Sequence, residues 1–309
     1  MAAKIVTIVG GSGFVGRHTV GRFAEAGWRV RVLCRDTVAA EFLKTAGHPG
    51  QIVLDYADIT RAETLAGKFA GSDVVVNLAG ILYQSGRQRF DSVQHQGARH
   101  VAEAAKNAGA GRLIHISALK AEAASEARYG LTKIAGEMAV CDAVPGASIL
   151  RPGLIIGPED GFFQRFGRMS MISPFLPVVA GGRTKFQPVL VTDVAEAIFA
   201  AATRSDVAGK TYEIAGDRIY SMRELMALLL RLTGRRNLVI SIPRPVAMVM
   251  GFFCELLPFP PMITRDQVRL LKTDNVASAG ALQLRDLGIT PAAVEDALPQ
   301  FLTRFQARP

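Results

Sequence analysis

Tyr129 and Lys133 stand four positions apart in the segment Tyr-Gly-Leu-Thr-Lys. In a helix this spacing places both side chains on one face. A positive ammonium beside a phenol favours the phenolate, so the pair predicts a tyrosine that passes a proton to a carbonyl oxygen as that carbonyl receives hydride. Ser117, at the end of an apolar run, would hydrogen-bond the same oxygen, and Lys133 would also hold ribose hydroxyls. The alternative is a surface Tyr and Lys pair on an ordinary helix.

A glycine pattern near the start of the chain would supply the hydride carrier. Gly10, Gly13 and Gly16 follow an apolar run at 5–9 and open an amphipathic pattern over 15–26. Glycines at this spacing permit a tight turn, close approach of the backbone to a pyrophosphate, and close packing of the helix on the strand. Free N–H groups and the helix dipole would then face the phosphates. A merely tight turn between strand and helix is the alternative.

Short apolar runs alternate with helical patterns along the first half of the chain. The runs lie at 29–34, 51–54, 73–78, 112–117 and 147–150, and a long helix is predicted over 90–107. Because each run follows a helical stretch, the pattern indicates βαβ units and a parallel sheet. We predict an α/β fold with a Rossmann-type, doubly wound parallel sheet and a smaller, partly helical C-terminal lobe.

Two domains are expected. Residues 1–150 are predicted to form the dinucleotide-binding Rossmann domain, to which the segment 186–216 is a candidate to add strands. Residues 151–309 would form a substrate or partner lobe over the carboxyl edge of the sheet, where ligands of open α/β sheets bind. Prolines between 152 and 188 break regular structure, so this tract is predicted to be rich in loops.

Composition narrows the class of partner. The 309 residues include 36 Lys and Arg against 27 Asp and Glu, a net charge of +9, which suits an acidic partner, a phosphate-bearing ligand or an anionic lipid surface. Nucleic acid is not expected, because no basic run is interleaved with aromatics. The three cysteines and five histidines lack metal-ligand spacing. We expect no metal site and a reducing compartment.

The cellular location of the protein is predicted from the length of its apolar runs and from its N-terminal residues. The first strand begins by Lys4, which leaves no room for a signal peptide, and no apolar run reaches the ~20 residues that cross a bilayer. A cytoplasmic protein is expected, either free or peripheral on the inner face of the membrane.

These motifs together resemble those of short-chain dehydrogenases/reductases of the extended or atypical type. The three glycines match the phosphate turn of that family, Asp58-Ile59 its adenine contact, and Asn77-Leu-Ala-Gly80 its mid-sheet motif. Ser117, Tyr129 and Lys133 match its catalytic set, and the segment from Arg151 resembles the one that flanks the nicotinamide. The resemblance implies a dinucleotide site made by Gly10, Gly11, Ser12, Gly13, Phe14, Val15, Gly16, Arg17, Arg35, Asp58, Ile59, Leu78, Ala79, Gly80, Tyr129, Lys133, Pro152 and Gly153.

A narrower resemblance within that superfamily is to the NADPH-binding accessory subunits of respiratory complex I (NADH:ubiquinone oxidoreductase). This resemblance rests mainly on the segment Leu257-Pro-Phe-Pro-Pro-Met-Ile-Thr-Arg265-Asp-Gln-Val. This resemblance implies a mainly structural nucleotide and an association with complex I or quinone metabolism. A free-standing NADPH-dependent oxidoreductase of a lipophilic or small carbonyl compound is one alternative, and a sugar-nucleotide epimerase or dehydratase is another. The intact Tyr129 and Lys133 pair leaves activity open.

The end of the second predicted strand bears on the choice of cofactor. Cys34 stands where the NAD users of the resembled family tend to have the Asp that binds the ribose diol, and Arg35 follows it. The guanidiniums of Arg35 and Arg17 would pair with a 2'-phosphate, so NADP(H) is predicted. NAD(H) is the alternative, because Asp36 could serve a ribose diol.

Two apolar segments are candidate contact surfaces. The segment 244–258, followed by Phe259-Pro-Pro, reads as a helix too short to cross a bilayer, and it is either a core helix or an interfacial one. The segment 162–179 would be a lid over a hydrophobic substrate such as a quinone, or a membrane-facing loop. Through 162–179 and 244–261 we expect contact with complex I or with a membrane surface.

Overall fold

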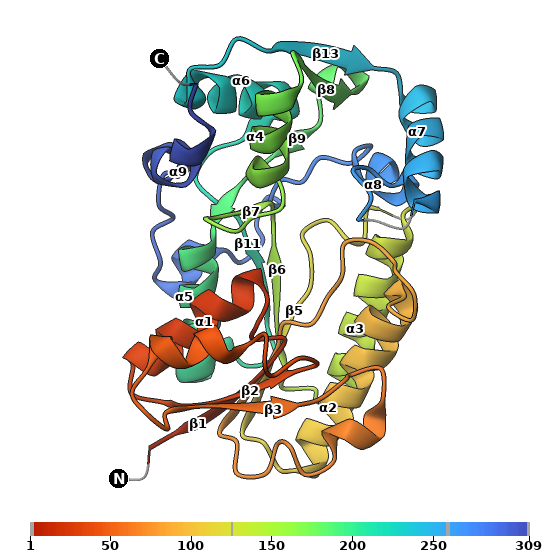
Figure 1. Cartoon of the computed structure of the whole chain (residues 1–309). Coiled ribbons are helices and arrows are strands. Elements are labelled where there is room, and N and C mark those ends of the chain that lie inside the picture. The colour runs from red at the N-terminus through yellow and green to blue at the C-terminus, as the bar shows by residue number, and fades with distance from the viewer. Residues whose placement is uncertain (1–2, 125, 258–259, 308–309) are drawn as a thin grey trace.

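The computed structural model describes residues 3–124, 126–257 and 260–307. Its centre is a seven-stranded parallel sheet in the order β11-β6-β5-β4-β1-β2-β3 (Figure 1). The strands are β1 Ile5–Val9, β2 Arg29–Cys34, β3 Ile52–Tyr56, β4 Val74–Asn77, β5 Arg112–Ile116, β6 Ser148–Pro152 and β11 Thr211–Ile214. The inner strands are runs of buried Val, Ile and Leu, as expected for a parallel sheet covered on both faces. The predicted α/β, Rossmann-type fold is confirmed.

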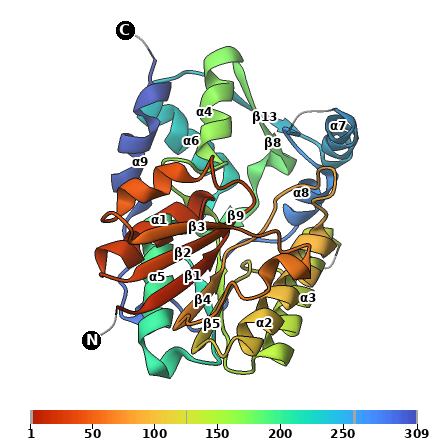
Figure 2. The same cartoon turned by 60° about the horizontal axis from the view of Figure 1, so that its bottom comes forward.

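Helices cover both faces of this sheet (Figures 1 and 2). On one face α1 (Phe14–Glu25) packs against α5 (Val191–Thr203), and on the other α2 (Gly97–Asn107) packs against α3 (Arg128–Ala143). Val6 and Ile8 of β1 point into the core under α1 and α5, while Val9 belongs to the core under α2 and α3. The alternation of side chains along a strand thus divides one sheet between two helical layers.

The strand order reverses between β1 and β4. From β1 the chain builds outward through β2 and β3, then crosses back to β4 and builds outward on the other side through β5 and β6. At such a reversal the two connections leave the sheet in opposite directions and open a crevice at the carboxyl ends of the strands. The glycine turn after β1 and the segment after β4 therefore border one crevice.

Two predictions about the connections are wrong. The links from β2 to β3 and from β3 to β4 contain no α-helix but short 3₁₀ turns, Glu41–Ala46 and Ala62–Leu65. The tract 152–188, predicted to be rich in loops, holds the ten-residue helix α4 (Phe163–Ile172) and the strand β8 (Phe175–Val179). Its prolines lie outside α4, and Pro177 lies within β8, so they do not prevent these two elements from forming.

The C-terminal half forms a second group of elements at the carboxyl edge of the sheet (Figure 1). Paired short strands are β7 Ile155–Ile156 with β10 Val189–Leu190, β9 Lys185–Phe186 with β12 Tyr220–Ser221, and β8 with β13 Leu238–Ile242. Its remaining helices are α6 Met222–Thr233, α7 Arg244–Leu256, α8 Arg265–Leu270 and α9 Val294–Leu302. A separate core gathers α4, α6, α9 and β8. The division into domains at residue 150 stays a prediction.

The two apolar segments differ in the structure. Phe163 of α4 is fully buried, and Phe162, Phe166 and Met169 pack against the same core, so the aromatic start of the segment 162–179 belongs to a packed helix rather than to a loop. The helix α7, in contrast, buries only Ala247 and Gly251. The predicted end of this helix, Pro258, and the following Phe259 lie outside the described residues. Within the part of the chain that is described, no helix has the length and apolar character needed to cross a membrane.

Gly136 sets how closely α3 approaches the chain before α2. That chain is a turn of π-helix, Asp91–Gln96, which continues into α2 and makes the predicted helix over 90–107 irregular at its start. A Cβ on Gly136 would overlap the carbonyl oxygen of Gln94.

We predict that Gly136→Ala lowers the free energy of unfolding by about 1–3 kcal/mol, as overpacking does, measured by urea denaturation. Gly21→Ala, in α1 with no atom within 4 Å of the new Cβ, is the control; it should raise stability by ~0.5–1 kcal/mol. If the two substitutions changed the free energy of unfolding equally, close packing at Gly136 would not explain the effect.

Candidate functional site

The turn from β1 into α1 has little room for side chains at Gly10, Gly11 and Gly16. Gly10 has a φ of +78°, which favours glycine. A Cβ on Gly16 would lie 2.5 Å from the carbonyl oxygens of both Gly10 and Gly11, and one on Gly10 would lie 3.2 Å from the amide nitrogen of Ala79. Gly13 is the N-cap of α1, and no side chain caps this end of the helix. Its free N–H groups and dipole therefore suit a phosphate.

The other predicted residues of this turn, Ser12, Phe14 and Val15, are partly exposed. Ser12 and Val15 are half-buried. The ring of Phe14 lies against the segment after β7, since a Cβ on Gly157 would come within 2.9 Å of it. The turn thus contacts the C-terminal half of the chain.

The segment after β4 forms the wall opposite this turn. Leu78 donates its N–H to the carbonyl of Val9 at 3.0 Å, so it continues alongside β1. The side-chain oxygen of Asn77 accepts the N–H of Ala79 at 3.2 Å and shapes the bend that leads to the exposed Gly80. Leu78 and Ala79 are therefore next to Gly10, as their predicted role requires, and Gly80 follows them toward Lys133.

Asp58 and Ile59 follow β3, near the sheet edge. The Asp58 carboxylate accepts hydrogen bonds from the N–H and hydroxyl of Thr60, at 3.0 and 2.8 Å. The ring of His100 donates Nδ1–H to the Ile59 carbonyl at 2.8 Å, and Ile59 fills the space above Gly97. These contacts fix the bend after β3, and both hydrogen bonds to the Asp58 carboxylate use the same oxygen, Oδ1.

The two arginines predicted to bind a 2'-phosphate differ in their surroundings. Arg35 is exposed and stands two residues beyond Leu33, whose carbonyl accepts the N–H of Gly10 at 2.9 Å. Arg17 pairs with Glu159 at 3.3 Å, and its guanidinium lies 4.7 Å from the ring centre of Phe42. Because a carboxylate already pairs with Arg17, Arg35 is the better placed of the two for an added phosphate.

Lys133 reaches the centre of the crevice from α3. It is only 5% exposed, and its ammonium donates to the Ile116 carbonyl, the last residue of β5, at 3.0 Å. A Cβ on Gly80 would lie 3.3 Å from Lys133 Nζ. The lysine therefore lies across from the wall after β4. Burial lowers the pKa of Lys133 to about 8, while the nearby Glu137 carboxylate acts in the opposite direction.

Tyr129 lies one turn earlier on α3, with its ring edge-on to Phe90 at 5.9 Å between ring centres. Burial raises the pKa of Tyr129 to about 12. The expected lowering of the Tyr129 pKa by the neighbouring ammonium is not found, because desolvation by burial raises this pKa. A phenol that keeps its proton at neutral pH is suited to donate one.

Ser117 and His115 supply buried polar atoms beside Lys133. Ser117 is 3% exposed, and its hydroxyl has no hydrogen-bond partner among the described residues. Asn77 Nδ2 donates to His115 Nδ1 at 3.2 Å, which leaves the buried His115 Nε2 also without a described partner. Burial and the Lys133 charge lower the pKa of His115 to about 3, so the ring is neutral. Unpaired buried polar atoms are unfavourable and point to a ligand or water that completes them.

Pro152 and Gly153 connect the sheet to the C-terminal half. The Pro152 carbonyl accepts the N–H of Leu119 at 2.9 Å, and the N–H of Gly153 donates to Ile214 of β11 at 2.9 Å. A Cβ on Gly153 would lie 3.0 Å from the carbonyl oxygen of Gln187. Both residues thus lie at the carboxyl end of β6, on the same edge of the sheet as the glycine turn.

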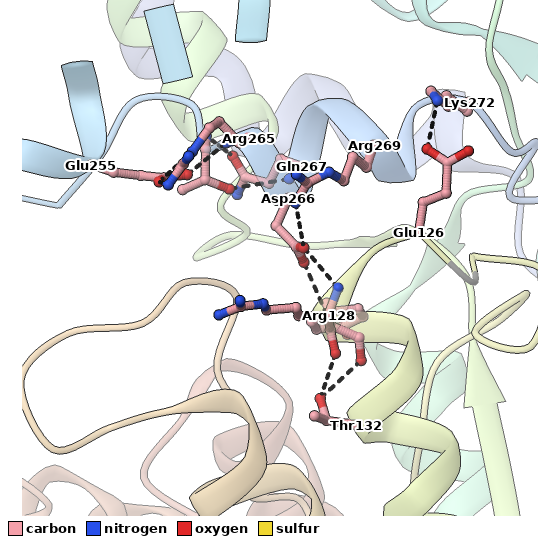
Figure 3. A network of polar contacts seen from close by, with 11 residues as sticks. Glu126, Arg128, Thr132, Glu255, Arg265, Asp266, Gln267, Arg269 and Lys272 are labelled. Carbon is pink, nitrogen blue, oxygen red and sulfur yellow. Dashed lines mark hydrogen bonds and ion pairs between the residues drawn. The ribbon is translucent and has the colours of Figure 1, made fainter. Parts of the chain in front are cut away.

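Asp266, which the sequence analysis did not single out, holds the start of α3 (Figure 3). Its carboxylate accepts the N–H groups of Arg128 and Tyr129 at 2.8 and 3.0 Å. The carboxylate therefore acts as an N-cap supplied by α8, and its charge complements the helix dipole. Thr264 and Gln267 form a capping box that fixes α8 itself. The one available signal was the Thr-Arg-Asp-Gln segment, whose contact with α3 cannot be read from spacing.

The middle of α3 is held by an ion pair that spacing also did not reveal. Glu137 is 7% exposed and accepts two hydrogen bonds from Arg151 of β6, at 2.9 and 2.6 Å. A two-point pair of this kind fixes direction as well as distance. Lys133 and Tyr129 are thereby oriented by contacts on both sides.

A nicotinamide dinucleotide fits this arrangement. The glycine cradle has no side chains to obstruct a pyrophosphate, α1 presents uncapped N–H groups, and Lys133 and the unpaired Ser117 hydroxyl lie further along the same carboxyl edge. The profile of the NAD dependent epimerase/dehydratase family matches residues 6–215, which include all of these positions. The chain belongs to this family. The predicted resemblance to short-chain dehydrogenases/reductases is confirmed.

Two curated relatives match most of the chain. The Arabidopsis thaliana mitochondrial protein "NADH dehydrogenase [ubiquinone] 1 alpha subcomplex subunit 9" is 34% identical over 98% of this chain and 78% of the relative. A ceramide reductase of Caulobacter vibrioides is 33% identical over 81% of this chain and 79% of the relative. The narrower resemblance to complex I accessory subunits is therefore confirmed as homology.

Solved structures share the fold at low identity. MoeE5 in complex with UDP-glucose and NAD has a TM-score of 0.73 at 17% identity, over 97% of this chain and 98% of MoeE5. The NADPH-dependent quinone oxidoreductase QOR2 of Escherichia coli, complexed with NADPH, also has a TM-score of 0.73 at 17% identity, over 96% and 99% of the two chains. These neighbours share the fold, and the NAD dependent epimerase/dehydratase family supports a nicotinamide dinucleotide as cofactor.

The cap supplied by Asp266 can be tested by substitution. We predict that Asp266→Ala lowers the free energy of unfolding by ~0.5–2 kcal/mol, the usual effect of losing an N-cap. Amide hydrogen exchange at Arg128 and Tyr129 should accelerate more than at the C-terminal end of α3, because the lost contacts are local. Asp296→Ala, at an exposed position in the first turn of α9, is the control. Unchanged exchange at Arg128 and Tyr129 would show that the carboxylate does not hold them.

Proposed function

We propose that this protein holds NADP(H) in the crevice at β1 and β4 and associates with respiratory complex I, with the nucleotide mainly stabilising the fold. The observation that carries the proposal is the homology to complex I accessory subunits over nearly the whole chain, combined with an intact glycine cradle. A nucleotide in the crevice would contact the turns after β1 and β4 together with the end of β6. It would therefore tie separate parts of the fold together, and a ligand that binds only the native state raises its stability.

The preference for NADP(H) rests on the end of β2. Arg35 is exposed there, and no carboxylate pairs with it in the described part of the chain. A guanidinium in this position would pair with a 2'-phosphate. Asp36, the rival for a ribose diol in NAD(H), uses its carboxylate to accept the N–H of Ala39 at 2.9 Å. This engagement makes Asp36 less available and favours NADP(H).

The cofactor assignment has a direct test. We expect native mass spectrometry of the purified protein to detect a nucleotide that survives desalting and carries the extra phosphate. In Arg35→Ala, affinity for NADPH should fall about 10- to 100-fold, the range for losing a hydrogen bond to a charged group, while affinity for NADH stays unchanged. Arg29→Ala, at the opposite end of β2, is the control. Tighter binding of NADH than of NADPH, unaffected by Arg35→Ala, would overturn the assignment.

A membrane surface is proposed as the second contact of the protein. Six of the apolar side chains of α7 are exposed, namely Val246, Val249, Met250, Phe252, Phe253 and Leu256. An exposed apolar helix face on a chain of net charge +9 suits the interface of an anionic membrane. The segment 162–179 contributes less, because Met171, Ile172 and Phe175 are its exposed apolar residues.

A reductase that acts on a lipophilic carbonyl compound is the second candidate function. The similarity to a ceramide reductase favours it, and so does the intact set of Ser117, Tyr129 and Lys133. In this mechanism the dinucleotide supplies hydride. Tyr129, whose raised pKa keeps it protonated, donates the proton to the carbonyl oxygen, and Ser117 orients that oxygen by a hydrogen bond. A sugar-nucleotide epimerase has only structural similarity in its favour, since MoeE5 shares the fold at 17% identity.

Turnover separates the two functions. If the protein is a reductase, NADPH consumption with a panel of lipophilic carbonyl compounds should fall ~10²–10⁴-fold in Tyr129→Phe, the usual contribution of a general acid, with NADPH affinity retained. The rate constant kcat/KM should decline as the pH rises past about 8, because Lys133 then loses the charge that stabilises the phenolate left after proton transfer. Lys133→Arg stays charged and should move this decline to higher pH. Absence of turnover, with comigration with complex I on native gels, would support the structural role.

A further inference from the structure

A cavity of about 1010 Å³ lies beside the start of α3. It is bounded by the loop after β4, by the first residues of α3, and by Leu257, Pro260 and Pro261 between α7 and α8. Phe90, which packs on Tyr129, lines it. The cavity therefore adjoins the crevice but is formed by different residues from those of the glycine cradle.

All three carboxylates that line this cavity are already engaged. Glu126 pairs with Lys272 at 2.6 Å, on the side of α8 shown in Figure 3. Glu255 accepts two hydrogen bonds from the Arg265 guanidinium at 2.9 and 2.8 Å. Asp266 caps α3. The acidic groups thus have their partners, and the capped start of α3 has no free N–H at Arg128 or Tyr129 to offer an anion.

Two of the four arginines that line the cavity lack such partners. Arg265 is paired with Glu255, and Arg269 lies 3.9 Å from Asp266. Arg89 and Arg128 make no ion pair and no side-chain hydrogen bond with the described residues. Figure 3 shows the Arg128 side chain directed away from the Glu126 and Lys272 pair. The cavity therefore presents two guanidiniums, from different elements, whose forked donors match phosphate oxygens.

The wall of the cavity toward α7 is apolar. Leu257, Pro260 and Pro261 line it. Leu257 directly follows the last turn of α7, where Phe253 and Leu256 are exposed. A ligand with an anionic group at the arginines and hydrocarbon toward α7 would satisfy both walls.

We propose that this cavity binds the phosphate head group of an anionic membrane phospholipid, with Arg89 and Arg128 as its ligands and the acyl chains directed along α7. The inference rests on the membrane association proposed above and deepens it. An apolar helix gives affinity for the interface, and two unpaired guanidiniums beside it give preference for a negative head group.

The test is sedimentation of the full-length protein with vesicles of phosphatidylcholine alone and of phosphatidylcholine mixed with phosphatidylglycerol. We expect tighter binding to the mixed vesicles. Arg89→Gln with Arg128→Gln should weaken that binding about 25-fold, taking about fivefold for each basic residue near an anionic surface, and should leave binding to phosphatidylcholine unchanged. Thermal unfolding should not move, because these side chains make no described contact that the substitutions remove.

Arg244→Gln is the matched control. Arg244 is an exposed arginine at the first turn of α7, away from the cavity. If it weakens binding as much as the double variant does, surface charge alone explains the preference and the cavity site is overturned. If the double variant binds both vesicles like the parent, the head-group site fails while membrane association stands. Failure of the parent to bind either vesicle overturns both.

A soluble phosphate compound is the other source of the same chemistry. Inorganic phosphate, added to the protein without vesicles, should raise the unfolding temperature little and should not prevent binding to the mixed vesicles. A large shift that disappears in the double variant, without any preference for phosphatidylglycerol, would assign the cavity to a soluble phosphate and overturn the phospholipid.

Discussion

The close approach of the main chain after β1 to the main chain after β4 is the constraint on which the rest of the structure depends. At this point the strand order reverses, and both the φ of +78° at Gly10 and the 3.2 Å that would separate a Cβ there from the amide nitrogen of Ala79 favour glycine. Gly16 then allows α1 to begin directly above the turn. The same contacts that open the crevice thus bring the uncapped end of α1 to its floor, so folding of the sheet and formation of an anion site are one event.

The chemistry of the crevice depends equally on how α3 is held. Three different elements fix this helix: the turn before α2 at Gly136, β6 through the Glu137 ion pair, and α8 through Asp266. Fixing the helix buries Lys133, and burial lowers its pKa to about 8. With its pKa near neutral pH, Lys133 changes its protonation state readily when a charged or polar group binds beside it. A bound ligand that hydrogen-bonds the ammonium would restore the charged form, which couples the protonation of the site to its occupancy.

Local patterns in the sequence predicted much of this. The glycine turn, the parallel sheet and the position of Lys133 follow from spacing and alternation, because they depend on residues close together in the chain. What spacing could not predict depends on contacts across the fold. Asp266 caps a helix 138 positions earlier in the chain. The pKa of Tyr129 moves opposite to the predicted direction because burial, which a sequence does not display, raises it. Pro158 and Pro174 lie on either side of α4, and their spacing does not reveal that a ten-residue helix forms between them.

The exposed face of α7 follows from how this helix packs. Its buried residues are Ala247 and Gly251, which are four positions apart and therefore on one face. A Cβ on Gly251 would lie 2.8 Å from the amide nitrogen of Arg265, so the helix meets the start of α8 at backbone distance. Contact through small residues leaves no volume for the larger ones, and Val249, Phe253 and Leu256 face outward. In α4 the reverse holds, since Phe163 itself fills the core. The two apolar segments therefore differ in exposure. The large residues of α7 are exposed because small residues make its contact, whereas α4 makes its contact through the large side chain of Phe163.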